Sequence, residues 1–300
     1  MQTKLEYIVD QITVKNSIHS KKIKKNIAKF DDAYFSRAKD FIDTYEVLLE
    51  KEGKDLDYAI DCYLHMIDDF KFETIQFMHT GKYSSSSFEE VNKRVYDNPS
   101  IMEYYMHGLL LSQFLWAHHY FTLLHFNDLL NQNSSNINTY LEVGGGHGLY
   151  ISEAIKNIDS KARFDLVDIS SSSLNIAKKM ISNDTVNYIL SDVFDYSPAI
   201  TYDFITMGEV LEHVEDPLAL LEKLHALLSD DGKLFITTPT NAPAIDHIYL
   251  FKNIDEINKI IDKAGFKVEK EATFFSEDLP LELMEKHKIS ILYTGLLVKK

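Results

Sequence analysis

The chain has 300 residues, 45% of them apolar, and a formal net charge of −15 at pH 7. This length fits one large domain or two, and the apolar content is ordinary for a globular protein. The excess of acidic residues disfavours nucleic acid and anionic membranes as partners, because binding to either depends on clustered Lys and Arg.

Residues 1–130 are predicted to form helices throughout. Apolar side chains recur at steps of three and four residues, as at Phe41, Tyr45 and Leu48. The basic run from His19 to Lys29 is interpreted as the solvated face of one of these helices rather than as a binding tract.

A long helix is predicted from Ile101 to Leu130, after a break at Pro99. Its central part, Tyr104–Asn127, contains no Asp, Glu, Lys or Arg, but its four histidines argue against a membrane span and favour a buried helix beside a polar cavity. The single cysteine, Cys62, excludes an internal disulfide, and the N-terminus lacks the apolar core of a signal peptide. We therefore expect a cytoplasmic protein.

The pattern changes after the polar, turn-rich segment Leu130–Thr139, where short β-rich runs begin to alternate with helices. Such alternation predicts βαβ units and a parallel sheet. We therefore divide the chain into a helical region, 1–135, and a sheet domain, 136–300. The expected strands are Tyr140–Val143, Phe164–Val167, Val186–Leu190, Phe204–Met207, Leu234–Thr238, Phe266–Phe274 and Ile289–Val298. The expected helices between them are His147–Ile158, Ser172–Ile181, Pro217–Leu228 and Asn253–Ala264.

A glycine-rich turn follows the first predicted strand, where ligands bind in open parallel sheets. The dinucleotide fingerprint G-x-G-x-x-G fails in both registers, because it would need glycine at Leu149 or at His147. The pattern is instead acidic residue, then alternate glycines: Glu142, Gly144, Gly146 and Gly148. It resembles motif I of the class I S-adenosylmethionine-dependent methyltransferases, whose ligand has a cationic methionine portion in place of a pyrophosphate.

The resemblance extends over the second half of the chain. It implies a Rossmann-like sheet, parallel with one antiparallel C-terminal strand, and S-adenosylmethionine as cofactor. By the same resemblance, Asp168 and Ile169 after the second strand would bind the ribose, and Asp192 and Val193 after the third would bind the adenine. The segment MGEVLEHVEDP, Met207–Pro217, is similar to the E-x-L-E-H-x-x-x-P segment of small-molecule members, and places Glu209 beside the cofactor.

The resemblance implies methyl transfer to a small molecule at an oxygen, nitrogen or carbon acceptor. Methyltransferases that act on exocyclic base nitrogens carry N/D-P-P-Y/F after the fourth strand, where this chain has MGEV. Two alternatives share the fold: an S-adenosylmethionine-consuming cyclase or aminocarboxypropyl transferase that releases methylthioadenosine, and a non-catalytic binding subunit. The helical region is expected to roof the site, to set specificity and to form any homodimer contact.

Two histidines follow neighbouring strands of the expected sheet, His213 after the fourth and His247 after the fifth. Histidine suits a general base near neutral pH, and two histidines with a carboxylate can also hold a divalent metal. Glu209, Glu212 and Asp246 are the nearby carboxylates. In the long helix, Tyr104 and Tyr105 are candidates to face the sulfonium through cation–π attraction, with Tyr105 the one assigned to the site.

Overall fold

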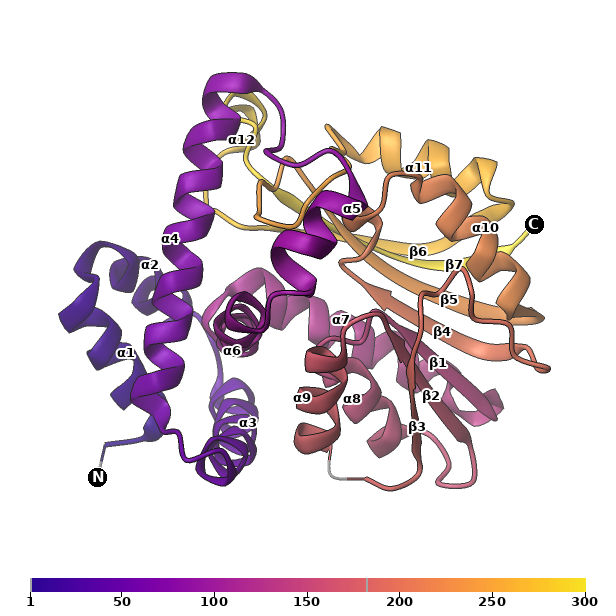
Figure 1. Ribbon diagram of the computed structural model, residues 1–300, viewed down its shortest axis with the longest axis horizontal. Helices are drawn as coiled ribbons and strands as arrows, with labels where there is room; N and C mark the ends of the chain where they lie inside the picture. The colour runs from indigo at the N-terminus through magenta and orange to yellow at the C-terminus, as the bar shows by residue number, and fades with distance from the viewer. Residues whose placement is uncertain (1, 182) are drawn as a thin grey trace.

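A seven-stranded sheet forms the C-terminal half of the computed structural model, which describes residues 2–181 and 183–300 (Figure 1). Among these residues the strand order is β3-β2-β1-β4-β5-β7-β6, and β7 alone runs antiparallel to its neighbours. The predicted sheet, parallel with one antiparallel C-terminal strand, is therefore confirmed. The strands are β1 (Thr139–Val143), β2 (Arg163–Asp168), β3 (Val186–Leu190), β4 (Tyr202–Gly208), β5 (Leu228–Thr240), β6 (Phe266–Phe275) and β7 (Ile291–Lys299).

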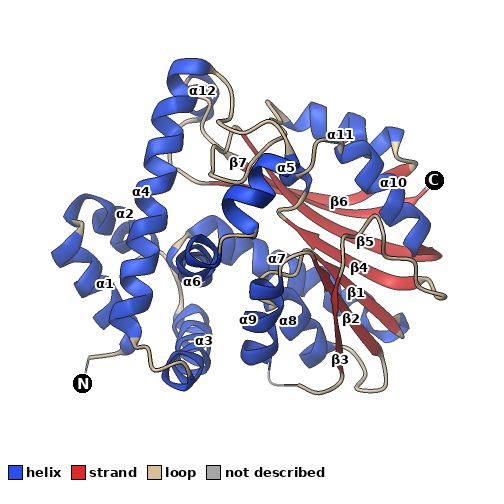
Figure 2. Cartoon of the chain, viewed as in Figure 1, coloured by secondary structure: helices blue, strands red, loops and turns tan. Residues whose placement is uncertain are grey.

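Helices cover both faces of the sheet (Figure 2). Successive side chains of a strand point to opposite faces, so Tyr140 and Leu141 of β1 join two different cores. The core around Tyr140 includes residues of α8 (Leu149–Asn157) and α9 (Ser171–Ile181), whereas the core around Leu141 includes residues of α10 (Pro217–Leu227) and α11 (Ile254–Lys263). Two short elements complete this half, η3 (Leu211–His213) and α12 (Leu281–Lys286).

The N-terminal half is helical, as the sequence predicts. Side-chain caps start several of its helices; Asp31 accepts a hydrogen bond from the Tyr34 N–H, and Asp55 accepts one from the Tyr58 N–H. The elements are α1 (Lys4–Lys15), α2 (Ser17–Ile27), α3 (Asp32–Lys51), α4 (Leu56–Thr80), α5 (Phe88–Val91), the π-helix η1 (Asn92–Tyr96), α6 (Pro99–Leu115), α7 (Ala117–Asn133) and η2 (Ser134–Asn136).

The prediction of one long helix from Ile101 to Leu130 is wrong. The chain breaks at Trp116, whose backbone is extended with φ −106° and ψ 123°, and α6 and α7 lie on either side of it. The two helices have different partners, since α6 packs on α4 while α7 packs on α8 and the β6–β7 edge of the sheet. The Trp116 indole N–H donates to the Tyr63 hydroxyl at 2.8 Å, which fixes the break against α4.

The boundaries of some elements also differ from the prediction. Strand β5 begins at Leu228, well before the expected Leu234, because Leu228 pairs with Tyr202 of β4. The sequence analysis did not identify α12. One core joins the N-terminal helices to one face of the sheet, so the two halves are packed together. In the described part of the chain, no helix combines the length and the apolar character needed to cross a membrane.

Candidate active site

The turn after β1 needs glycine for two separate reasons. Gly144, Gly146 and Gly148 have φ values of 66°, 49° and 72°, in the left-handed region that side chains rarely adopt. A Cβ on Gly144 would collide with Val210, and one on Gly148 would lie 2.8 Å from Ile181. A Cβ on Gly146 would meet nothing closer than Met106 Cε at 3.7 Å. Gly146 is thus the glycine whose missing side chain leaves the main chain open to a ligand.

Asp168, at the end of β2, is hydrogen-bonded to this turn. One carboxylate oxygen accepts the Gly146 N–H at 3.0 Å and the other accepts the Ser170 N–H at 2.7 Å. Burial raises the pKa of Asp168, although these backbone donors oppose the shift. The side chain therefore sits between the glycine turn and the start of α9, with its carboxylate held by both.

Two adjoining cavities meet at the glycine turn. The smaller, about 450 Å³, is bordered by four residues predicted to hold the nucleoside: Asp168, Ile169, Asp192 and Val193. The larger, about 680 Å³, is bordered by α4 and α6 and reaches Glu142 and His247. Gly144, Gly146, Tyr105, Glu209 and His213 border both cavities.

Two of the predicted cofactor residues have mainly local partners. Glu142 is buried and accepts the Ile151 N–H at 2.6 Å, so it is bonded to the first turn of α8; burial raises its pKa to about 8. Gly148 borders neither of the two cavities; it lines a separate space of about 290 Å³ between α3 and α8.

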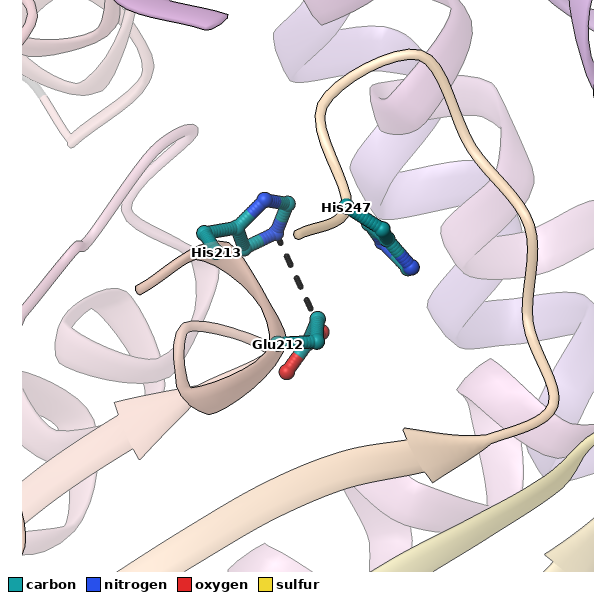
Figure 3. A group of neighbouring side chains, drawn as sticks. All are labelled: Glu212, His213 and His247. Carbon is teal, nitrogen blue, oxygen red and sulfur yellow. Dashed lines mark ion pairs between the residues drawn. The ribbon is translucent and has the colours of Figure 1, made fainter. Parts of the chain in front are cut away.

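Glu212, His213 and His247 form a cluster at the ends of β4 and β5 (Figure 3). One ligand atom from each lies within 4.8 Å of the others. The Oε2 atom of Glu212 accepts the Thr238 hydroxyl at 2.8 Å, while its buried Oε1 has no partner among the described residues and lies 3.8 Å from His213 Nε2. Figure 3 shows the carboxylate of Glu212 beside the two imidazole rings.

Backbone carbonyls fix the tautomers of both histidines. His213 Nδ1 lies 3.0 Å from the Asp246 carbonyl oxygen, and His247 Nδ1 lies 2.5 Å from that of Ala242. Since a carbonyl oxygen only accepts, the hydrogen of each neutral ring is on Nδ1 and the lone pair is on Nε2. Each ring can therefore accept a proton or bind a metal through Nε2.

The electrostatics of the cluster favour the neutral forms of Glu212, Glu209 and His247 and the protonated form of His213. Burial raises the pKa of Glu212 and of Glu209, and the nearby charge of Glu212 adds to the shift at Glu209. Burial, with His213 nearby, lowers the pKa of His247 to about 4. Burial opposes a charge on His213, but Asp246 and Glu212 outweigh it and raise its pKa.

The helical half contributes two tyrosines to this cluster. The Tyr105 hydroxyl, from α6, donates to Asp246 Oδ1 at 3.1 Å, and the Tyr96 hydroxyl, from η1, lies 3.2 Å from His213 Nδ1. Tyr104 is directed elsewhere and donates to Asp69. Sequence reasoning missed Tyr96, because it lies in a π-helix 117 residues before His213 and belongs to no motif.

A comparison with protein families identifies the second half of the chain. A family model described as "Methyltransferase domain" matches residues 116–271, which is more than half of the chain. The curated relatives include the malonyl-[acyl-carrier protein] O-methyltransferase 1 of Ilyobacter polytropus, 27% identical over 46% of this chain and 56% of its own length. The ubiquinone biosynthesis O-methyltransferase of Actinobacillus pleuropneumoniae serotype 7 is 30% identical over 43% of this chain and 57% of its own length.

These matches are partial, since this chain spans little more than half the length of each of the two relatives. A solved structure, that of the mitomycin 7-O-methyltransferase MmcR, superposes with a TM-score of 0.54 and 13% identity, over 77% of this chain and 68% of the other. At that identity the superposition shows a shared fold. The resemblance drawn from the sequence is confirmed at the level of family and fold.

Proposed function

The chain belongs to the methyltransferase-domain family of class I S-adenosylmethionine-dependent enzymes, and from this premise we propose that it transfers the methyl group of S-adenosylmethionine to a small-molecule acceptor. The observation that carries this proposal is the glycine turn, where Gly146 leaves the main chain open at the junction of two cavities. A donor and an acceptor can meet at such a junction.

The smaller cavity suits the nucleoside of the cofactor. Its wall carries the Asp168 carboxylate beside the turn, for the ribose hydroxyls, and the Asp192–Val193 segment, for the adenine. Gly144 and Gly146 border both cavities, so the methionine portion would cross them toward the larger one. The cationic sulfonium would then face the acceptor at the edge shared by His213 and Tyr105.

The larger cavity suits the acceptor. Phe70 of α4, Tyr105 of α6 and Trp116 at the α6–α7 break contribute aromatic walls, and Asn241, Asp246 and His247 contribute polar groups. Because much of this wall comes from residues before 135, we propose that the helical region sets acceptor specificity. The two curated relatives named above are O-methyltransferases, which supports an oxygen acceptor.

An acceptor hydroxyl must lose its proton on methylation, and the Glu212–His213–His247 cluster is placed to assist. A carboxylate oxygen of Glu212 and one ring nitrogen of each histidine lie within 4.8 Å of one another, which is the donor set of a site for a divalent metal with open positions. A divalent cation bound there would supply Lewis acidity that lowers the pKa of a coordinated hydroxyl. The second shell is present, since Thr238, Asp246 and Ala242 hold the three side chains in place.

A metal-free role for His213 is the second candidate. Its Nδ1–H is held by Asp246, whose own carboxylate receives Tyr105 and Tyr96, and this support orients the ring as a general base. Dialysis of the enzyme against EDTA separates the roles. Activity lost to EDTA and restored by a divalent ion supports the metal, whereas full activity after dialysis supports the base.

The nucleoside product tests the reaction class. Methyl transfer releases S-adenosylhomocysteine, while cyclisation or aminocarboxypropyl transfer releases methylthioadenosine. The purified protein is incubated with S-adenosylmethionine and a panel of hydroxylated acceptors, and the nucleosides are identified by mass spectrometry. Acceptor-dependent S-adenosylhomocysteine is the expected product. Methylthioadenosine would contradict methyl transfer, and an absence of turnover with intact cofactor binding would favour a binding subunit.

A further inference from the structure

The break at Trp116 places His119 in the first turn of α7, on the wall of the larger cavity. The side chain is 6% exposed, and its Nε2 lies 3.8 Å from Glu209 Oε1, at the end of β4. No hydrogen bond joins either of these atoms to another described residue. Two polar atoms from the two halves of the chain thus face each other across a short gap beside the glycine turn.

The hydrogen-bond pattern shows that His119 presents an acceptor to this gap. The Ser112 hydroxyl donates its one hydrogen to the Leu109 carbonyl at 2.7 Å, so it accepts the hydrogen of His119 Nδ1, 3.0 Å away. The Gln113 amide nitrogen lies farther from Nδ1, at 3.4 Å, and also donates to the Leu109 carbonyl. The Nε2 atom therefore carries a lone pair. Burial lowers the pKa of this histidine to about 3, so the ring stays neutral at physiological pH.

Glu209 is held toward the same gap by its backbone. Its φ is 52°, in the left-handed region, and its N–H donates to the Thr237 carbonyl at 2.9 Å. A non-glycine residue adopts this conformation only where its surroundings impose it, which is common at functional sites. The conformation places the carboxylate at the border of both cavities.

When Glu209 is ionised, its carboxylate and the imidazole lone pair of His119 are both acceptors, so a donor between them is needed and a cationic donor suits both. The methionine portion of S-adenosylmethionine carries one such group, its α-ammonium, with three N–H donors. A cofactor with its ribose at Asp168 that crosses Gly144 and Gly146 brings this portion to the stretch of wall formed by Glu209 and His119.

We propose that His119 and Glu209 together bind the α-ammonium group of the cofactor, so that a residue of the first α7 turn helps to hold the methyl donor. This inference rests on the proposed use of S-adenosylmethionine and deepens it. It also gives a function to the break at Trp116, because a continuous helix would change the direction in which His119 projects.

Calorimetric titration with three ligands tests the proposal. S-adenosylhomocysteine carries the ammonium and the carboxylate, its decarboxylated analogue keeps only the ammonium, and methylthioadenosine lacks both. His119→Phe, which keeps a ring and removes the acceptor, should weaken the first two by roughly five- to tenfold and leave methylthioadenosine unchanged. Glu209→Gln should act in the same direction, and His119→Gln, which restores an acceptor, should recover most of the affinity.

His65→Phe is the control, because His65 stacks on Tyr104 of α6 and borders neither of the two cavities. It should leave all three affinities near the wild-type values. Equal weakening of all three ligands by His119→Phe, or none, would overturn the assignment. Methylthioadenosine binding shows in the same titration that each variant is folded. If the wild-type protein binds none of the ligands, the proposed function fails instead.

Discussion

The nucleoside side and the acceptor side of the site are built in different ways. The nucleoside side consists of main chain and side chains in the loops that follow β1, β2 and β3. Its hydrogen-bonded residues are close in sequence, since Gly146 and Asp168 lie 22 residues apart. The acceptor side joins residues that are distant in sequence: Tyr105 is 141 residues from its partner Asp246.

The difference follows from what each side must recognise. A cofactor of fixed structure can be held by the ends of consecutive strands, which the sheet topology places at one edge. An acceptor needs a wall on the opposite side of the reacting atoms, and here α4, α6 and the first turn of α7 supply it. A substitution on the acceptor side should therefore lower turnover and leave cofactor affinity unchanged. A substitution on the cofactor side should lower cofactor affinity, and turnover should fall with it.

The largest expected effect is on the acceptor side alone. Alanine at His213 or at His247 should lower kcat by roughly 10²–10⁴, because the acceptor loses the group that assists its deprotonation. The affinity for S-adenosylhomocysteine should change little. Steady-state kinetics and calorimetry measure the two effects, and His79→Ala, exposed at the end of α4, is the control. Turnover at the wild-type rate in both variants would show that neither histidine takes part in catalysis.

Gly146→Val is the converse experiment, which breaks the cofactor side. The new side chain would project into the space left open at the turn, so S-adenosylmethionine binding should fall by roughly 100-fold or more. Gly53→Val is a matched control, since Gly53 also has a positive φ, 70°, and no heavy atom within 4 Å of an added Cβ. The control should show the cost of backbone strain in its Tm and keep its cofactor affinity. Equal affinity in both variants would contradict the role of the turn.

Asp168→Ala should have a smaller effect on the same side. The loss of one charge-assisted hydrogen bond to the ribose costs about 1.5–3 kcal/mol, and the variant also loses the acceptor of the Gly146 N–H. S-adenosylmethionine and S-adenosylhomocysteine should weaken alike, by roughly 10- to 100-fold, because both carry the ribose. A variant that distinguishes the two ligands would show that Asp168 lies beside the sulfur rather than the ribose.

The last effect is on stability rather than on turnover or cofactor affinity. Burial raises the pKa of Glu142 to about 8 from an unfolded value of 4.5, so the folded state binds the proton more tightly. The stabilisation from that proton is complete below about pH 4.5 and is lost as the pH rises toward 8. Glu142→Gln cannot ionise, so its Tm should rise relative to that of the wild type as the pH increases from roughly 5 to 8. If the difference in Tm between the variant and the wild type does not change with pH, the pKa of Glu142 is not raised in the folded protein.

The contrast between the two sides also explains what the sequence could predict. The alternation of strands and helices and the glycine turn follow from periodicity and from one short motif, whereas the antiparallel last strand and the place of Asp168 follow from the family resemblance. The Trp116 break was missed because no Pro or Gly marks it; it arises where α6 and α7 pack on different partners. Tyr96 and His119 were missed for the same reason, since tertiary packing brings them to the site. The specificity role of residues 1–135, the proposed site residues and a homodimer through the helices remain predictions.

A crystal structure of the protein with S-adenosylhomocysteine would test the central claim most directly. The ribose hydroxyls should lie at Asp168, the adenine beside Asp192 and Val193, and the sulfur at the junction of the two cavities, toward His213. A ligand bound away from the Gly144–Gly148 turn, or crystals that stay empty at saturating ligand, would contradict it.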